Sequence, residues 1–160
     1  MNLSSEPAVS LRIECSGSLI HKVDLSLHPF FSCEIQSAEP QLEKAILTWL
    51  AHYAEKKPTP LPPIFFLEYL SSFHRKVLEQ MEHIVFGETK SYRELGKMAG
   101  YSKANQAVGG ACKRNPFPLF FPCHRVISSN GSIGGFALDL RIKERLLAFE
   151  GVIPLTLSSE

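Results

Sequence analysis

A cysteine followed by a histidine, Cys123-His124, is the pair of residues in this chain best suited to covalent chemistry. A cysteine attacks as its thiolate, and a histidine can accept the thiol proton near neutral pH. The pair follows an apolar run bounded by prolines, Pro116 to Pro122. Most free cysteines are small buried hydrophobic residues, so the dipeptide alone is compatible with a nucleophile and with a packing residue.

The cysteine lies in a stretch of chain that carries only positive charge. The whole sequence is nearly balanced, with 17 basic and 16 acidic residues. No acidic residue occurs between Glu94 and Asp139, whereas the same stretch contains five basic residues: Lys97, Lys103, Lys113, Arg114 and Arg125. A polyanion could approach such a surface without repulsion. Chance sorting of charge on a solvated face would give the same pattern.

Two short helices are predicted before the cysteine. Ser91-Tyr92-Arg93-Glu94 has the form of a capping box, so a helix should begin there and end at Gly100. Ser102 can cap a second helix that runs to about Arg114, where Asn115-Pro116 ends it. Two short helices around a glycine-containing turn form a helix-turn-helix. An ordinary helical hairpin would have a similar sequence.

The second of these helices has little apolar surface to bury. Its small residues are Ala104, Ala107, Gly109, Gly110 and Ala111. Each glycine weakens a helix by about 1 kcal/mol relative to alanine. Small residues permit a close approach to another surface, which could be a nucleic-acid groove or a second helix.

A proline-rich segment, 58–63, predicts a linker between two domains, 1–57 and 64–160. The N-terminal domain has strand-like stretches over 9–14, 17–25 and 30–35, followed by helical spacing of apolar residues over 41–53. This order predicts a small α/β domain. The C-terminal domain begins with a helical stripe of apolar residues between Phe66 and Ile84.

The segment from Asn115 to Val126 resembles the active-site signature of the O6-alkylguanine-DNA alkyltransferases, also called methylated-DNA–protein-cysteine methyltransferases. The segment 107–111 before it fits the same family, as do Gly87 to Tyr92 and Leu146 to Gly151. The resemblance implies an α+β fold. In this family a small ribonuclease-H-like α/β domain precedes a mainly helical domain with a winged-helix or helix-turn-helix motif.

The resemblance also implies roles for the residues around the cysteine. Cys123 would take the alkyl group from O6-alkylguanine, or from O4-alkylthymine, in a single turnover, after the base has been flipped out of the duplex. His124 would relay the thiol proton through a water molecule, and Glu150 would hold the imidazole. Tyr92 would protonate the leaving guanine. Asn115 would tie the helix-turn-helix to the cysteine. Glu150, Tyr92 and Asn115 could instead have ordinary structural roles.

Double-stranded DNA is the partner that the resemblance implies, with the second helix in a minor groove about 6 Å wide. The residues expected to contact DNA are Lys103, Ala104, Gln106, Ala107, Gly109, Gly110, Lys113, Arg114 and Arg125. The residues expected to form the base pocket are Tyr92, Val126, Phe136 and Ala137.

The largest departure from the family pattern is Gln106, because most members have an arginine there that enters the base stack. Glutamine brings no charge and less stacking area. We therefore expect weaker base flipping or weaker DNA affinity, with Lys103, Lys113 or Arg114 compensating in part.

No cofactor is expected. The four cysteines form no CxxC pair, and the spacing of Cys15, His21, His28 and Cys33 matches no standard zinc site. The sequence shows no signal peptide and no apolar run of the roughly 20 residues that a membrane span needs. We expect a cytoplasmic protein that acts as a monomer.

Two other functions fit parts of the sequence. Cys123, His124 and Glu150 could form the triad of a cysteine hydrolase, which would turn over many times and would need an oxyanion hole. The chain could also be a non-catalytic sensor of alkylated DNA. Family relatives of that kind lack the reactive cysteine, which is present here.

Overall fold

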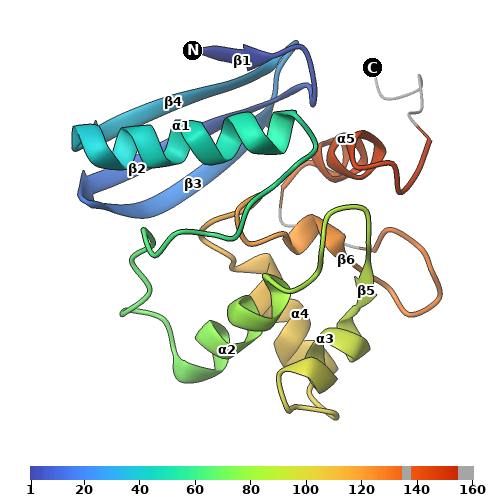
Figure 1. Ribbon diagram of the computed structural model, residues 1–160. Helices are drawn as coiled ribbons and strands as arrows, with labels where there is room; N and C mark the ends of the chain where they lie inside the picture. The colour runs from blue at the N-terminus through green and yellow to red at the C-terminus, as the bar shows by residue number, and fades with distance from the viewer. Residues whose placement is uncertain (135–137, 155–160) are drawn as a thin grey trace. The chain divides into compact units, whose positions relative to one another are not determined.

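The chain folds into two compact units, Met1–Phe66 and Leu67–Glu160, which are described separately. The structure is a computed structural model that describes residues 1–134 and 138–154. Strands and a long helix make up the first unit, and short helices dominate the second (Figure 1). The predicted α+β class is confirmed. The proline-rich segment 58–63 belongs to the first unit.

The first unit is a four-stranded mixed sheet with one helix. The strands are β1 (Asn2–Ser4), β2 (Val9–Gly17), β3 (Leu19–Leu27) and β4 (Phe31–Ala38), and the sheet order is β1-β4-β2-β3. β2 and β3 form an antiparallel hairpin, while β2 and β4 pair in parallel. The helix α1 (Pro40–Ala54) follows β4. The three strands and the helix that the sequence predicts are all present.

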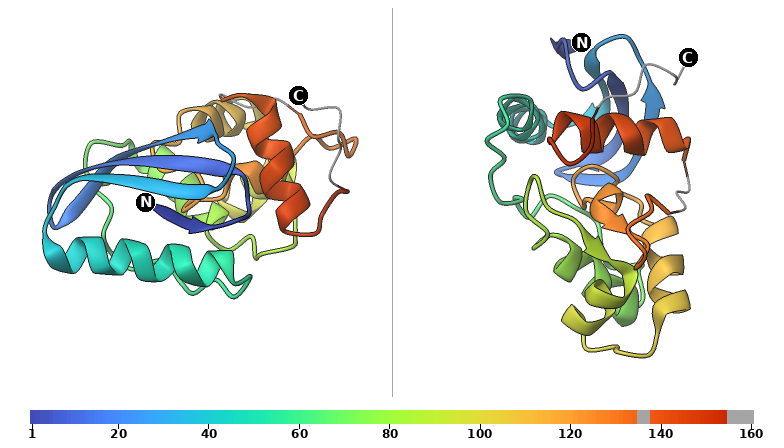
Figure 2. Two further views of the ribbon diagram at one scale, coloured as in Figure 1. Left: turned by 90° about the horizontal axis from the view of Figure 1, so that it is seen from above. Right: turned by 90° about the vertical axis from the view of Figure 1, so that its right-hand side faces the viewer.

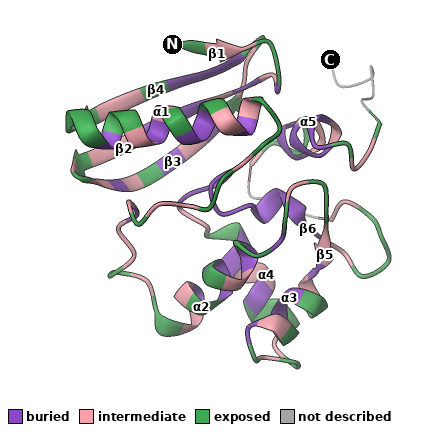
Figure 3. Ribbon diagram, in the orientation of Figure 1, coloured by how far each residue is buried: buried purple, intermediate pink, exposed green. Residues whose placement is uncertain are grey.

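The core of the first unit follows from two hydrophobic patterns. Val9, Leu11 and Ile13 alternate along β2 and are fully buried or nearly so. α1 buries one stripe that contains Ile46 and Leu50 and leaves its other side in solvent (Figure 3). β1 was not predicted, because three residues are too few to show a period.

The second unit contains four helices and one two-stranded ladder among its described residues. The helices are α2 (Ser72–Met81), α3 (Tyr92–Met98), α4 (Asn105–Lys113) and α5 (Leu140–Phe149). The strands β5 (Lys90–Ser91) and β6 (Val126–Ile127) pair in parallel, and a single 3₁₀ turn, Cys123–Arg125, comes directly before β6. α2, α3 and α4 pack against one another (Figures 1 and 2).

The predicted helix-turn-helix is formed by α3 and α4. Ser91 Oγ accepts from Glu94 N at 3.0 Å, and Ser91 N donates to Glu94 Oε1 at 3.2 Å, so the capping box is confirmed. Gly100 has a φ of +86° just after α3, as expected for a glycine that ends a helix. The prediction that Ser102 caps α4 was wrong. Residues 101–104 form a turn, and Ala104 is the N-cap without a side-chain bond.

None of the helices in the described part of the chain is both long enough and apolar enough to cross a lipid bilayer.

Candidate active site

Cys123 begins the 3₁₀ turn and is only 7% exposed. The loop before it folds back on itself, because Phe121 N donates to Phe117 O and Cys123 N donates to Phe121 O. Burial raises the pKa of the Cys123 thiol, and the Asn115 side chain and the Lys143 ammonium oppose that rise. The thiol is therefore protected from solvent but lies beside groups that favour its thiolate.

Asn115 connects the end of α4 to this loop. Its Nδ2 donates to Phe121 O at 2.8 Å, and its Oδ1 accepts from Phe117 N at 2.9 Å. Leu119 lies within the same loop, buried, with a φ of +77° that non-glycine residues seldom adopt. The amide of Asn115 thus connects the end of α4 to the tightly folded loop that carries the cysteine.

His124 and Glu150 form a fully buried pair. His124 Nε2 lies 2.6 Å from Glu150 Oε2. Burial pushes the pKa of Glu150 up, but the contacts with His124 and Arg125 outweigh burial and hold it well below its usual range. Glu150 is therefore an ionised acceptor, and Nε2 of His124 must carry the hydrogen that it donates.

The other imidazole nitrogen, Nδ1 of His124, is also buried and has no hydrogen-bond partner among the residues that the structure describes. Burial lowers the pKa of His124, although Glu150 opposes this effect. A neutral imidazole with its hydrogen on Nε2 has its lone pair on Nδ1. The pair is thus arranged so that Nδ1 can accept a proton.

Arg125 has a different position from the one expected. We placed it among the DNA contacts, but its side chain is buried. Its Nε donates to Glu150 Oε1 at 2.7 Å, its Nη2 donates to Glu150 Oε2 at 3.2 Å, and its Nη1 donates to Ile84 O at 2.7 Å. All of these bonds hold the guanidinium inside the protein. Arg125 therefore belongs to the His124–Glu150 network and not to the DNA surface.

Lys143 is a buried cation that sequence analysis missed. Its side chain is inaccessible to solvent, and Nζ donates to Val126 O at 2.8 Å. Burial lowers the pKa of Lys143 to about 8, while the thiols of Cys123 and Cys112 pull it upward. The sequence offered one indication of its burial, because Lys143 lies three residues before Leu146 and therefore on the same face of α5.

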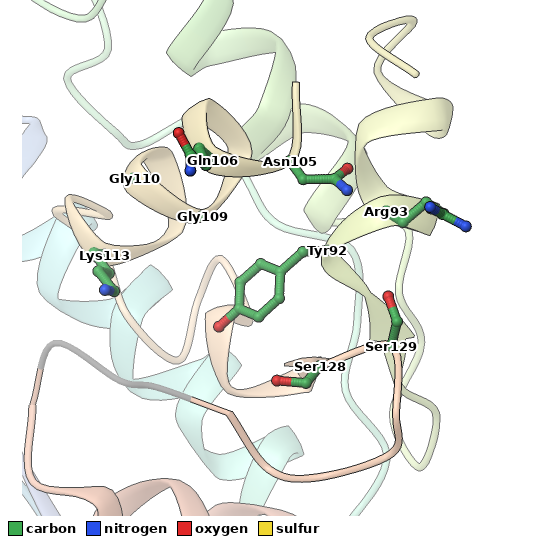
Figure 4. A pocket seen from close by; sticks show the side chains of 9 residues that line it. All are labelled: Tyr92, Arg93, Asn105, Gln106, Gly109, Gly110, Lys113, Ser128 and Ser129. Carbon is green, nitrogen blue, oxygen red and sulfur yellow. The ribbon is translucent and has the colours of Figure 1, made fainter. Parts of the chain in front are cut away.

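A cavity of about 520 Å³ lies between α4, the start of α3 and the segment after β6 (Figure 4). Nine residues line it: Tyr92, Arg93, Asn105, Gln106, Gly109, Gly110, Lys113, Ser128 and Ser129. None of the nine is acidic. Five were predicted as site residues, while Arg93 and Asn105 were missed because they carry no distinctive pattern.

Tyr92 lines the cavity and also lies near the thiol of Cys123. Its ring lies in the cavity, while Cys123 is not among the lining residues. Burial, together with the nearby thiols of Cys112 and Cys123, raises the pKa of Tyr92 to about 12. The phenol therefore keeps its proton at neutral pH.

The remaining predicted residues have varied positions. Lys103, Ala104, Ala107 and Arg114 lie on α4 or beside its ends and are at least partly exposed. Val126 is fully buried in β6. Phe136 and Ala137, predicted for the pocket, lie outside the described residues. No cluster of His, Cys, Asp and Glu within 1–134 and 138–154 could hold a metal ion.

The sequence matches a known family over its second unit. The family described as "6-O-methylguanine DNA methyltransferase, DNA binding domain" matches residues 72–152. A methylated-DNA–protein-cysteine methyltransferase from Cricetulus griseus is 47% identical over 115 residues, which cover 66% of this chain and 54% of that protein. The corresponding protein from Homo sapiens is 46% identical over 100 residues, covering 61% and 47%. The chain spans about half the length of these curated relatives.

The fold is also shared with solved structures. The O6-methylguanine methyltransferase of Mycobacterium tuberculosis superposes with a TM-score of 0.67 at 25% identity, covering 94% of this chain and 98% of that one.

Proposed function

The chain belongs to the 6-O-methylguanine DNA methyltransferase family, and from this premise we propose that it repairs DNA by transferring an alkyl group from guanine O6 to Cys123. One observation carries the proposal: the imidazole beside the cysteine is fixed by Glu150 through Nε2, and its buried Nδ1 has no partner in the described part of the chain. A group that must take a proton from a thiol needs this arrangement.

The first step is the formation of the thiolate. His124 accepts the proton of Cys123 at Nδ1 through a bridging water, and the resulting imidazolium is stabilised by the ionised Glu150 at 2.6 Å. Asn115 and the Lys143 ammonium favour the charged sulfur. These two neighbours offset part of the cost of placing a charge on a buried atom.

The second step is an in-line displacement at the alkyl carbon. A bond forms between Sγ of Cys123 and that carbon while the bond from the carbon to O6 breaks, and the electron pair remains with the guanine. Tyr92 donates a proton to the leaving base. The phenol carries its proton at neutral pH, so a proton is available when the base arrives.

The reaction is stoichiometric, because the thioether that forms is not a group that these residues can convert back to a thiol. One protein molecule therefore repairs one lesion. Guanine O6 is the expected target, and thymine O4 is a second one of the same chemical kind.

Binding and chemistry both belong to the second unit in this proposal. A base flipped from duplex DNA enters the cavity beside Tyr92, whose volume lies within the range of about 300–1,000 Å³ usual for small-molecule sites. α4 then lies in the minor groove. We infer further that the protein acts as a monomer in the cytoplasm, where reducing conditions keep cysteines free, as all four are here.

The test is the mass of the intact protein after incubation with a duplex that contains O6-methylguanine. We expect a gain of one methyl group per protein and none in a Cys123→Ser variant. DNA binding without any mass gain would indicate a sensor instead. Repeated release of product with no methyl left on the protein would indicate a hydrolase.

A further inference from the structure

One face of α4 is formed by Gln106, Gly110 and Arg114. These residues are four positions apart, so they lie one after another along the same side of the helix. Gln106 carries no charge, and its side chain points away from Tyr92 (Figure 4). Gly110 has no side chain. Among these three residues the charge comes from Arg114, at the end of the helix, while its neighbour Lys113 lines the cavity together with Gln106 and Gly110.

The guanidinium of Arg114 lies over Gly110. A Cβ atom placed on Gly110 would be 3.0 Å from Arg114 Nη1 and 3.4 Å from Nη2. The side chain thus runs back along α4 by about one turn, or about 6 Å, toward Gln106. Arg114 is exposed, and none of the ion pairs within 1–134 and 138–154 includes it. Its charge is available to a ligand.

Packing does not explain why position 110 is a glycine. At Gly96 a Cβ would be 2.9 Å from the backbone oxygen of Tyr101, so close packing requires that glycine. At Gly110 the three nearest atoms all belong to the movable guanidinium of Arg114. Because glycine weakens a helix relative to alanine, the absence of a side chain here needs another reason.

We propose that Arg114, lying over Gly110, supplies the phosphate-binding charge of this face of α4, and that Gly110 makes room for it. A guanidinium can donate two parallel hydrogen bonds to one phosphate. The ligand is the backbone of duplex DNA, so the inference rests on the proposed function. Of the three cations expected to compensate for Gln106, the proposal selects Arg114. The guanidinium lies about one helical turn closer to Gln106 than the backbone of Arg114 does.

The experiment is a double-mutant cycle on the affinity for an undamaged duplex, measured over a range of salt concentrations. Arg114→Ala should weaken binding about tenfold at low salt and reduce the salt slope by about 1. Gly110→Ala should weaken binding several-fold while raising the unfolding midpoint by about 2–4 °C, because alanine favours the helix. In the Arg114→Ala background, Gly110→Ala should have no further effect on affinity.

Gly109→Ala is the matched control, because it makes the same change one residue away, where a Cβ would meet only Tyr92 Cδ1 at 4.0 Å. Its effect on affinity should add to that of Arg114→Ala. Additive effects of Gly110→Ala and Arg114→Ala, or an unchanged salt slope in Arg114→Ala, would overturn the inference. Binding to undamaged DNA needs no reaction at Cys123, so a failure of alkyl transfer is distinguishable from a failure of this proposal.

Discussion

Glu150 Oε2 and His124 Nε2 lie 2.6 Å apart, and neither side chain is accessible to solvent. The same carboxylate receives two bonds from Arg125. One negative charge thus orients the imidazole and neutralises a buried guanidinium. Removal of that charge would affect both the reaction and the stability of the fold.

Glu150→Gln should therefore slow alkyl transfer and destabilise the protein. We expect a loss of rate on the order of 100-fold, since the imidazolium loses its counter-charge. We also expect a loss of about 3–5 kcal/mol in the free energy of unfolding, since Arg125 keeps a buried unpaired charge. Single-turnover kinetics and urea unfolding measure the two effects. Glu144→Gln on the same helix is the control and should change neither by a comparable amount.

The pH dependence should reflect the lowered pKa of His124. The imidazole must be neutral to accept the thiol proton, so the rate should stay constant as the pH falls through 6.5, its ordinary pKa, and decline only at lower pH. A rate that halves at pH 6.5 or above would show that burial does not outweigh Glu150 in setting the pKa of His124.

Stability should change with pH in the same direction. The pKa of His124 is lower in the folded state than in the unfolded state, so the unfolded chain binds more protons below about pH 6.5. The stabilisation is present above that pH and is lost as the pH falls through the folded pKa. Glu150, whose pKa is also depressed, adds a second loss that starts near pH 4.5. Urea unfolding of wild type at several pH values measures this loss.

Lys143→Met should lower the reactivity of Cys123 without removing a ligand contact. The buried ammonium favours the thiolate, and each unit by which the thiol pKa rises corresponds to about 1.4 kcal/mol. We expect about tenfold slower transfer from free O6-benzylguanine, which needs no DNA. Arg145→Met, on the same helix, is the comparison. Equal rates for the two variants would remove Lys143 from the mechanism.

Gly134→Ala should impair the site more than Gly131→Ala. Both glycines have a positive φ, +77° and +84°, so alanine has a similar backbone cost at each. At Gly134 a Cβ would lie 2.9 Å from Ser128 Oγ and 3.6 Å from Tyr92 Cε2, whereas at Gly131 it would meet nothing within 4 Å. The ratio of transfer rates between the two variants isolates the contact with Tyr92 and Ser128, and we expect it to be about tenfold.

Gln106→Arg should speed the repair of duplex DNA more than the reaction with a free alkylguanine. An arginine at this exposed position adds charge and stacking area where the helix meets the groove. The two rates are compared in one preparation of each protein. A similar gain on both substrates would mean that the substitution acts on the cysteine site and not on DNA.

The sequence predicted the elements that local rules determine. The capping box at Ser91, the stop at Gly100 and the strand over 9–14 each depend on neighbouring residues, and each was confirmed. Ser102 is not the cap, because residues 101–104 form a turn and α4 begins only after Ala104, which makes no side-chain cap bond.

Residues whose role depends on distant contacts were harder to predict. The charge of Arg125 suggested a DNA contact, but Glu150, 25 residues later, holds it in the interior. Lys143 was overlooked because lysines are rarely buried. Only the fold brings these residues together, and no local pattern in the sequence shows that pairing.

The short ladder of β5 and β6 also limits how this sequence can vary. Lys90 pairs with Val126, and Ser91 pairs with Ile127. Tyr92 follows β5 directly, and the 3₁₀ turn of Cys123 precedes β6 directly, so this register fixes the position of one relative to the other. A slip of one residue would move one partner by about 3.3 Å. Insertions and deletions should therefore be excluded between Lys90 and Tyr92 and between Cys123 and Ile127, whereas the exposed tip at residues 129–132 can vary in length.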